Sequence, residues 1–180
     1  MAFLQWGLIS YTLILISILV SLIVWQNKHL MQYGFHLDFY QRGDYWSFMK
    51  QIWLFQFIHG DILHLVMNCY FLYIAGPVLE SSLWVMNFLI FFLSTTIVSV
   101  FGLYFFAPRS NTIGISGFCM ALLSYLWITL YMVADPWASR IATLLVINIA
   151  FWFVPGISFV GHATGAIWGI AFWYITQNII

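Results

Sequence analysis

The stretch that decides the fold is residues 114–134, GISGFCMALLSYLWITLYMVA. It contains no charged residue, and it is long enough to cross a bilayer, because a spanning helix takes about 20 apolar residues. Near its start, Ser116 stands between Gly114 and Gly117. The stretch therefore predicts a membrane helix that begins with a polar, glycine-containing turn.

The composition extends this prediction to the whole chain. Hydrophobic residues make up 64% and charged residues 6% of the 180 residues, and the mean hydropathy is +0.98. A soluble domain carries about 25% charged residues, so a soluble fold is excluded. We expect a single all-α domain over residues 1–180, a polytopic membrane bundle of six transmembrane helices near residues 6–25, 62–79, 82–106, 114–134, 137–154 and 160–180.

The charge pattern limits the possible partners. The formal net charge is zero, with five Lys and Arg in total, so there is no basic stripe to neutralise phosphates and nucleic-acid binding is excluded. The long polar segment at residues 26–60 mixes charged and aromatic side chains, which predicts a first loop that lies partly in the membrane interface. Cys69 and Cys119 lie in apolar stretches and are interpreted as packing residues.

Polar side chains gather around the start of the second expected span, at His59, Asp61, His64 and Asn68. Polar groups are costly in hydrocarbon and face the bundle interior or a water-filled cavity. His64 and Asn68 are four residues apart, so a helix places them on one face. The alternative interpretation is that these side chains only bond neighbouring helices.

The last expected span carries His162 three residues before Gly165, with Gly169 one turn later. Small residues four apart let membrane helices approach closely without any chemistry. On a helix, however, His162 and Gly165 lie on nearly the same face. We therefore expect the glycines to bring this span against the one that begins at Ser116.

Taken together, these motifs resemble the rhomboid intramembrane serine proteases. The resemblance covers about residues 46–180 and rests on His59, His64 and Asn68, on the Gly114–Gly117 motif, and on His162, Gly165 and Gly169. It also places Gly76 and Glu80 at the family's glycine and acidic positions at the end of the second span.

The resemblance implies a serine endopeptidase that cleaves peptide bonds in or near transmembrane segments through an acyl-enzyme. Ser116 would be the nucleophile, and His162 the general base and then the acid. The Ser116 amide, His64 and Asn68 would form the oxyanion site. No acidic third member is evident, so we expect a Ser-His dyad, no cofactor, and single-pass transmembrane proteins as substrates. The residues expected to support the site are His59, Gly76, Glu80, Gly114, Gly117, Met120, Gly165 and Gly169.

The chain departs from the family pattern at three places, which leaves a second interpretation open. Lys50-Gln51 replaces a Trp-Arg pair, Met120 replaces an aromatic residue, and Gly161 replaces an alanine. The alternative is an inactive relative that binds membrane helices without cutting them. A metal or ion pathway through His59, His64, His162 and Asn68 is a third class, disfavoured because no acidic or cysteine ligand completes a tetrahedral set.

The charges and the resemblance disagree on orientation. Four of the basic residues fall in the first and third loops, which the positive-inside rule would place in the cytoplasm. The family places that face outside. Because the charges are few, we follow the resemblance and expect a multi-pass protein of the plasma (inner) membrane, with both termini in the cytoplasm.

Overall fold

The structure is a computed structural model that describes residues 7–150 and 158–179. Within these ranges there is no named strand, only an isolated bridge between Phe35 and Thr112, so the all-α prediction is confirmed. The predicted spans run into residues 6, 151–154 and 180, which lie outside the described residues. The elements are α1 (Leu8–Gln26), η2 (Lys28–Tyr33), α2 (Asp38–Gln41), α3 (Tyr45–Leu54), η3 (Phe55–Phe57), α4 (Ile62–Phe106), α5 (Ser116–Met132), α6 (Trp137–Ala150) and α7 (Phe159–Ile179).

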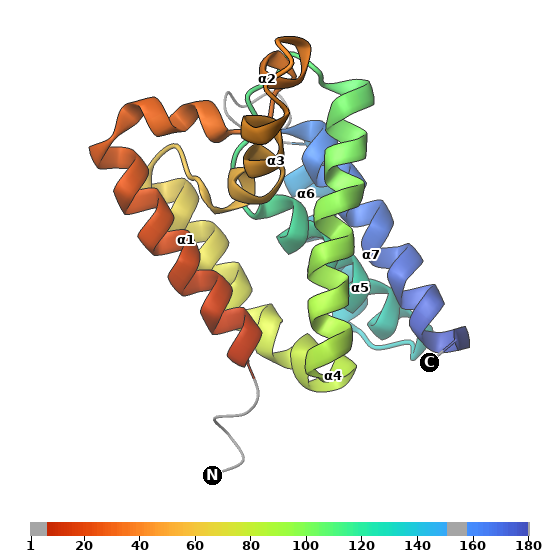
Figure 1. Cartoon of the computed structure of the whole chain (residues 1–180). Helices are drawn as coiled ribbons and strands as arrows, with labels where there is room; N and C mark the ends of the chain where they lie inside the picture. The colour runs from red at the N-terminus through yellow and green to blue at the C-terminus, as the bar shows by residue number, and fades with distance from the viewer. Residues whose placement is uncertain (1–6, 151–157, 180) are drawn as a thin grey trace.

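Helix α4 contains both the second and the third expected spans. It consists of two helical limbs joined at a kink, where Trp84 has φ 65° and ψ 151°. Figure 1 shows α4 reversing its direction at the lower end of the molecule. The predicted break at residues 80–81 was therefore misplaced. Ser81 and Ser82 donate their hydroxyls to the Val78 carbonyl one turn back, so these polar residues remain helical.

Helix α5 lies at the centre of the bundle. All eight residues from Phe118 to Tyr125 are buried, as expected for a helix with neighbours on every side. Its most extensive contact is with α7, and it also packs on α4 and α6. Aromatic rings fill the space between these helices, with Phe91 of α4 stacked on Phe172 of α7 at 4.4 Å between ring centroids.

Glycines set the close contact between α5 and α7. A methyl group added at Gly165 would collide with the Gly117 carbonyl, and one added at Gly169 would collide with the Ala121 carbonyl. The backbones therefore approach within a distance that only glycine permits. This contact places the first turn of α7 beside the first turn of α5, where Ser116 lies.

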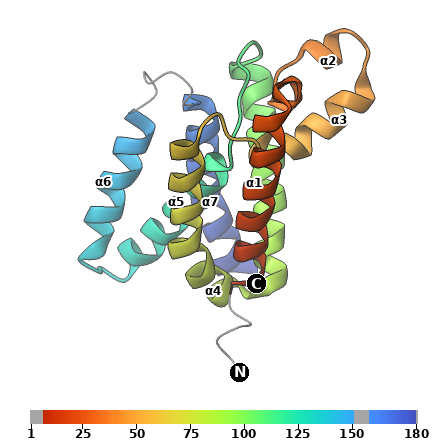
Figure 2. The same ribbon diagram turned by 90° about the vertical axis from the view of Figure 1, so that its left-hand side faces the viewer.

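The outer surface is apolar and the polar residues are inside or at the ends. Helix α1 buries its serines, Ser10, Ser17 and Ser21, and exposes leucines such as Leu15 and Leu19. Figure 2 shows α2 and α3 at one end of the bundle and the connection from α5 to α6 at the other. Within residues 7–150 and 158–179, two helices, α1 and α4, are long and apolar enough to cross a membrane, by length and composition.

Glu80 joins α4 to the first turn of α1. Its carboxylate accepts hydrogen bonds from the backbone N–H groups of Ile9 and Ser10 at 2.9 Å and from the Ser10 hydroxyl at 2.8 Å. The first N–H groups of a helix have no partner within the helix, and a negative charge there is favourable. Gly76 lets Ser10 approach, since an added methyl would lie 2.5 Å from the Ser10 hydroxyl oxygen.

We predict that Glu80→Ala lowers the free energy of unfolding by about 2–4 kcal/mol, because it leaves three donors, two of them buried, without an acceptor. Glu80→Gln should lose less, since its amide oxygen can still accept. Unfolding of the detergent-solubilised protein by a denaturing detergent would measure both. If Glu80→Ala were as stable as the unchanged protein, the carboxylate would have no structural role.

Candidate active site

Ser116 is the first residue of α5, and the turn before it requires glycine. Gly114 has φ +99°, a left-handed conformation that side chains other than glycine rarely adopt. The N–H groups of the first helical residues have no acceptor within the helix, so they are free to bind a negative charge. The sequence motif thus places a serine hydroxyl where backbone donors are available.

His64 and Asn68 approach this turn from α4. A Cβ added at Gly114 would lie 2.7 Å from His64 Nε2 and 3.5 Å from Asn68 Nδ2. Both expected oxyanion side chains therefore converge on the residue two positions before Ser116. Among the described residues Asn68 Nδ2 has no hydrogen-bond partner, although Asn68 is only 7% exposed. A buried, unpaired donor is costly, which is understandable where a ligand supplies the acceptor.

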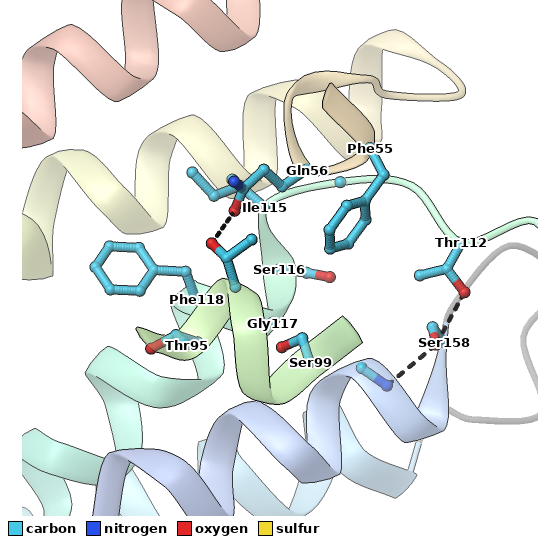
Figure 3. Close-up of a pocket in the computed structure, with 13 residues that line it drawn as sticks. Phe55, Gln56, Thr95, Ser99, Thr112, Ile115, Ser116, Gly117, Phe118 and Ser158 are labelled. Atoms are coloured by element: carbon cyan, nitrogen blue, oxygen red, sulfur yellow. Dashed lines mark hydrogen bonds between the residues drawn. The ribbon is translucent and has the colours of Figure 1, made fainter. Parts of the chain in front are cut away.

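A small polar cavity opens beside Ser116. Its volume is about 20 Å³, enough for roughly one water molecule. The Ser116 hydroxyl points into it (Figure 3). The polar side chains that line it besides Ser116 are Gln56, Thr95, Thr96, Ser99, Thr112 and Ser158.

Four of these cavity residues were missed by the sequence reasoning, namely Gln56, Thr95, Thr96 and Ser99. Thr95, Thr96 and Ser99 are polar residues at helical spacing inside an otherwise apolar span, and this signal could have identified them. Gln56 accepts a hydrogen bond from the Thr96 hydroxyl at 3.0 Å, and its Nε2 has no partner among the described residues. The cavity thus joins Ser116 to hydroxyl and amide groups of α4 and of the first loop.

His162 lies in the first turn of α7 and is 7% exposed. Its Nδ1 is 3.1 Å from the backbone carbonyl oxygen of Asn148 in α6. A carbonyl only accepts hydrogen bonds, so Nδ1 carries the proton and the neutral ring leaves Nε2 unprotonated. The nitrogen that is able to accept a proton is therefore the one not engaged by α6.

The structure brings the helices that carry Ser116 and His162 together without joining the two side chains. A Cβ added at Gly117 would lie 3.2 Å from the Gly161 carbonyl oxygen, so the residues next to the serine and the histidine are in contact. Among the described residues there is no hydrogen bond between Ser116 and His162. Such bonds are often long in a site without substrate and tighten when substrate binds.

The comparison with known proteins agrees with these motifs. A family model described as the Rhomboid domain matches residues 42–178. The chain belongs to the rhomboid family. It is therefore a membrane protein, in keeping with its two long apolar helices. No curated protein is similar enough in sequence to count as a match. All of α1 precedes the range that the rhomboid domain covers.

Two of the three departures from the rhomboid pattern have a structural explanation. Gln51 is fully buried, and its Nε2 donates to the Gly34 carbonyl, so it anchors the first loop through an amide. Met120 packs in an apolar cluster with Leu145 of α6 and Ala166 of α7. It thereby helps to seat α6, whose carbonyl binds His162. At Gly161, an added methyl would meet the Ser158 side chain at 3.2 Å and the Thr112 side chain at 3.9 Å.

His59 lies in the loop before α4 and supports His64. The two imidazole rings meet edge to face, with 4.9 Å between their centroids. His59 is fully buried, and burial lowers its pKa from 6.5 to about 4. In the part of the chain that the structure describes, no three His, Cys, Asp or Glu side chains gather as metal ligands would.

This pKa predicts a pH-dependent stability. Between pH 6.5 and 4, His59 becomes protonated in the unfolded chain but stays neutral in the folded protein. The free energy of unfolding therefore falls as the pH is lowered. The total loss should be about 3 kcal/mol, at roughly 1.4 kcal/mol per pKa unit, and should level off below pH 4. Thermal unfolding from pH 7 to 4 would measure it. His59→Gln should remove this part of the slope, whereas His29→Gln, at an exposed position, should keep it.

Proposed function

We propose that this rhomboid protein is an intramembrane serine endopeptidase acting through Ser116 and His162. The observation that carries the proposal is the convergence of His64 and Asn68 on Gly114, beside a serine that begins a helix and points into a polar cavity. Peptide hydrolysis passes through a tetrahedral oxyanion, which requires donors already aimed at it. The Ser116 amide, the Asn68 amide and the His64 ring would supply them.

The chemistry follows from these positions. Ser116 Oγ attacks the scissile carbonyl carbon while its proton passes to His162 Nε2. The C–N bond then breaks, and the imidazolium protonates the leaving amine. The acyl-enzyme is hydrolysed when a water attacks the ester and gives its proton to His162, which returns it to Ser116. The Asn148 carbonyl bound at Nδ1 holds the ring and favours its charged form during each transfer.

The membrane placement is part of the same proposal. Helices α1, α5, α6, α7 and the two limbs of α4 would be six transmembrane helices, with the first loop lying partly in the interface. An even number of spans agrees with Figure 1, in which the first turn of α1 and the last turn of α7 lie at one end. We propose that this end faces the cytoplasm at the plasma (inner) membrane, and that single-pass membrane proteins are the substrates.

A serine-directed fluorophosphonate tests the proposal. The protein in proteoliposomes should be labelled at Ser116, with loss of labelling in Ser116→Ala and strong slowing in His162→Ala, and chelators should have no effect. Mass spectrometry of the labelled peptide would locate the adduct. Labelling that persists in Ser116→Ala would contradict the assignment.

One observation favours the alternative of an inactive relative that binds membrane helices without cleaving them. Among the described residues Ser116 and His162 share no hydrogen bond, and a serine without its base is a weak nucleophile. The same labelling experiment separates the two functions. Unreactive Ser116 in a folded protein that still binds a transmembrane peptide would support the inactive relative.

A further inference from the structure

Helix α1 reaches the candidate site although it precedes the matched rhomboid domain. The Ser21 hydroxyl lies 3.0 Å from His59 Nδ1 and 3.1 Å from the Phe57 carbonyl oxygen. One turn later, Trp25 Nε1 donates to the His59 carbonyl at 2.8 Å. Two side chains of α1, those of Ser21 and Trp25, therefore bind the short loop that leads into α4.

These contacts fix the side chain of His59. Its Nδ1 contacts only Ser21 and the Phe57 carbonyl, and its Nε2 has no partner among the described residues. The Phe57 carbonyl can only accept, so it accepts a hydrogen bond either from the Ser21 hydroxyl or from His59 Nδ1. In both arrangements the His59 ring is held beside Ser21 of α1. Removing the Ser21 hydroxyl would leave His59 with one long contact, of 3.3 Å, to hold its ring.

The orientation of His59 is passed on to His64. The His59 ring meets the His64 ring edge to face. Within the described residues the His64 imidazole makes no hydrogen bond of its own, so packing against His59 and Gly114 sets its direction. A rotation of His59 would therefore move His64 Nε2 relative to the turn that carries Ser116.

The rest of the α1 face shows that Ser21 differs from a simple packing residue. Ser17, one turn earlier, is equally buried, yet its hydroxyl has no hydrogen-bond partner among the described residues. Ser17 thus provides only the small volume that close helix packing needs. Ser21 has the same size and burial but bonds the His59 loop.

We propose that Ser21 and Trp25 are positioning residues that align the oxyanion donor His64 through His59. The proposal rests on the proposed protease function. It assigns α1, which lies outside the rhomboid match, a role in transition-state stabilisation. Because an oxyanion donor acts only in the transition state, loss of alignment lowers kcat and leaves KM unchanged.

Cleavage kinetics of a transmembrane substrate in proteoliposomes test this. Ser21→Ala should lower kcat about tenfold, the equivalent of one hydrogen bond, with KM unchanged. Trp25→Phe removes the N–H donor together with part of the ring, and it should act in the same direction. Ser21→Thr keeps a hydroxyl and should retain activity. Ser17→Ala is the matched control and should cleave like the unchanged protein.

A double-mutant cycle with His64 identifies the route. His64→Ala alone should lower kcat by about a hundredfold, and adding Ser21→Ala should cause no further loss. Equal activity of Ser21→Ala and Ser17→Ala would overturn the inference, as would a tenfold loss that persists in the His64→Ala background. If Ser116→Ala and His64→Ala both cleaved normally, the proposed function itself would be wrong, which is a separate outcome.

Discussion

Replacing Ser116 with alanine should abolish cleavage of a transmembrane substrate, with kcat falling by a factor of about 10⁴ or more. The hydroxyl that points into the polar cavity is the only protein nucleophile that the proposed mechanism uses, and water attacks only after Ser116 has formed the acyl-enzyme. His162→Ala should be nearly as severe, and the double variant no worse than Ser116→Ala, because nucleophile and base act as a unit. Product formation in proteoliposomes, followed by mass spectrometry, measures the loss.

The matched control for this experiment is Ser124→Ala. Ser124 is a buried serine of the same helix, and its hydroxyl donates only to the Ala121 carbonyl within α5. Cleavage should be unchanged in this variant. A similar loss in both variants would show that α5 tolerates no serine replacement, and Ser116 would then have no special part in the reaction.

Gly165→Ala should destabilise the bundle by about 1–3 kcal/mol, the usual cost of overpacking, and should strongly reduce cleavage. The added methyl would collide with the Gly117 backbone carbonyl, which cannot turn away as a side chain can. Helices α5 and α7 must therefore separate, and with them Ser116 and His162. Unfolding in a denaturing detergent and cleavage rate would both be measured.

Gly161→Ala is the control for that variant, one turn away on the same face of α7. Its methyl would meet side chains and no backbone atom, at 3.2 Å from the Ser158 hydroxyl oxygen and 3.9 Å from the Thr112 methyl group. Alanine is also the residue usual in the family at this position. Stability and cleavage should therefore be close to those of the unchanged protein. Equal losses in Gly161→Ala and Gly165→Ala would contradict the view that the Gly117 contact sets the helix spacing.

The sequence predicted the arrangement of site residues that lie close together along the chain. The Gly114–Gly117 motif indicated the serine at the start of a helix, and the four-residue spacing of His64 and Asn68 indicated their common approach to one point. In the structure, the side chains of both approach the Gly114 turn from α4. Such predictions succeed because helical spacing decides which side chains share a face.

Contacts between distant segments were not predictable in the same way. The Asn148 carbonyl that binds His162 is a backbone group, so it leaves no signal in the residue pattern. The chain reversal, which the structure has at Trp84, was predicted a few residues too early. The reason is that Glu80, a polar residue near it, bonds the first turn of α1 and does not form a loop. The sequence does not distinguish Ser21 from an ordinary residue of an apolar helix, because its partner His59 lies in a distant segment of the chain.

The most direct measurement of the central claim is an experimental structure of the protein after reaction with a fluorophosphonate. The account predicts a phosphonyl group on Ser116 Oγ, its oxygen within hydrogen-bond distance of Asn68 Nδ2 and the Ser116 amide, and His162 Nε2 facing the same centre. An adduct on another residue, or a modified Ser116 with His162 and Asn68 directed away from the phosphorus, would contradict it.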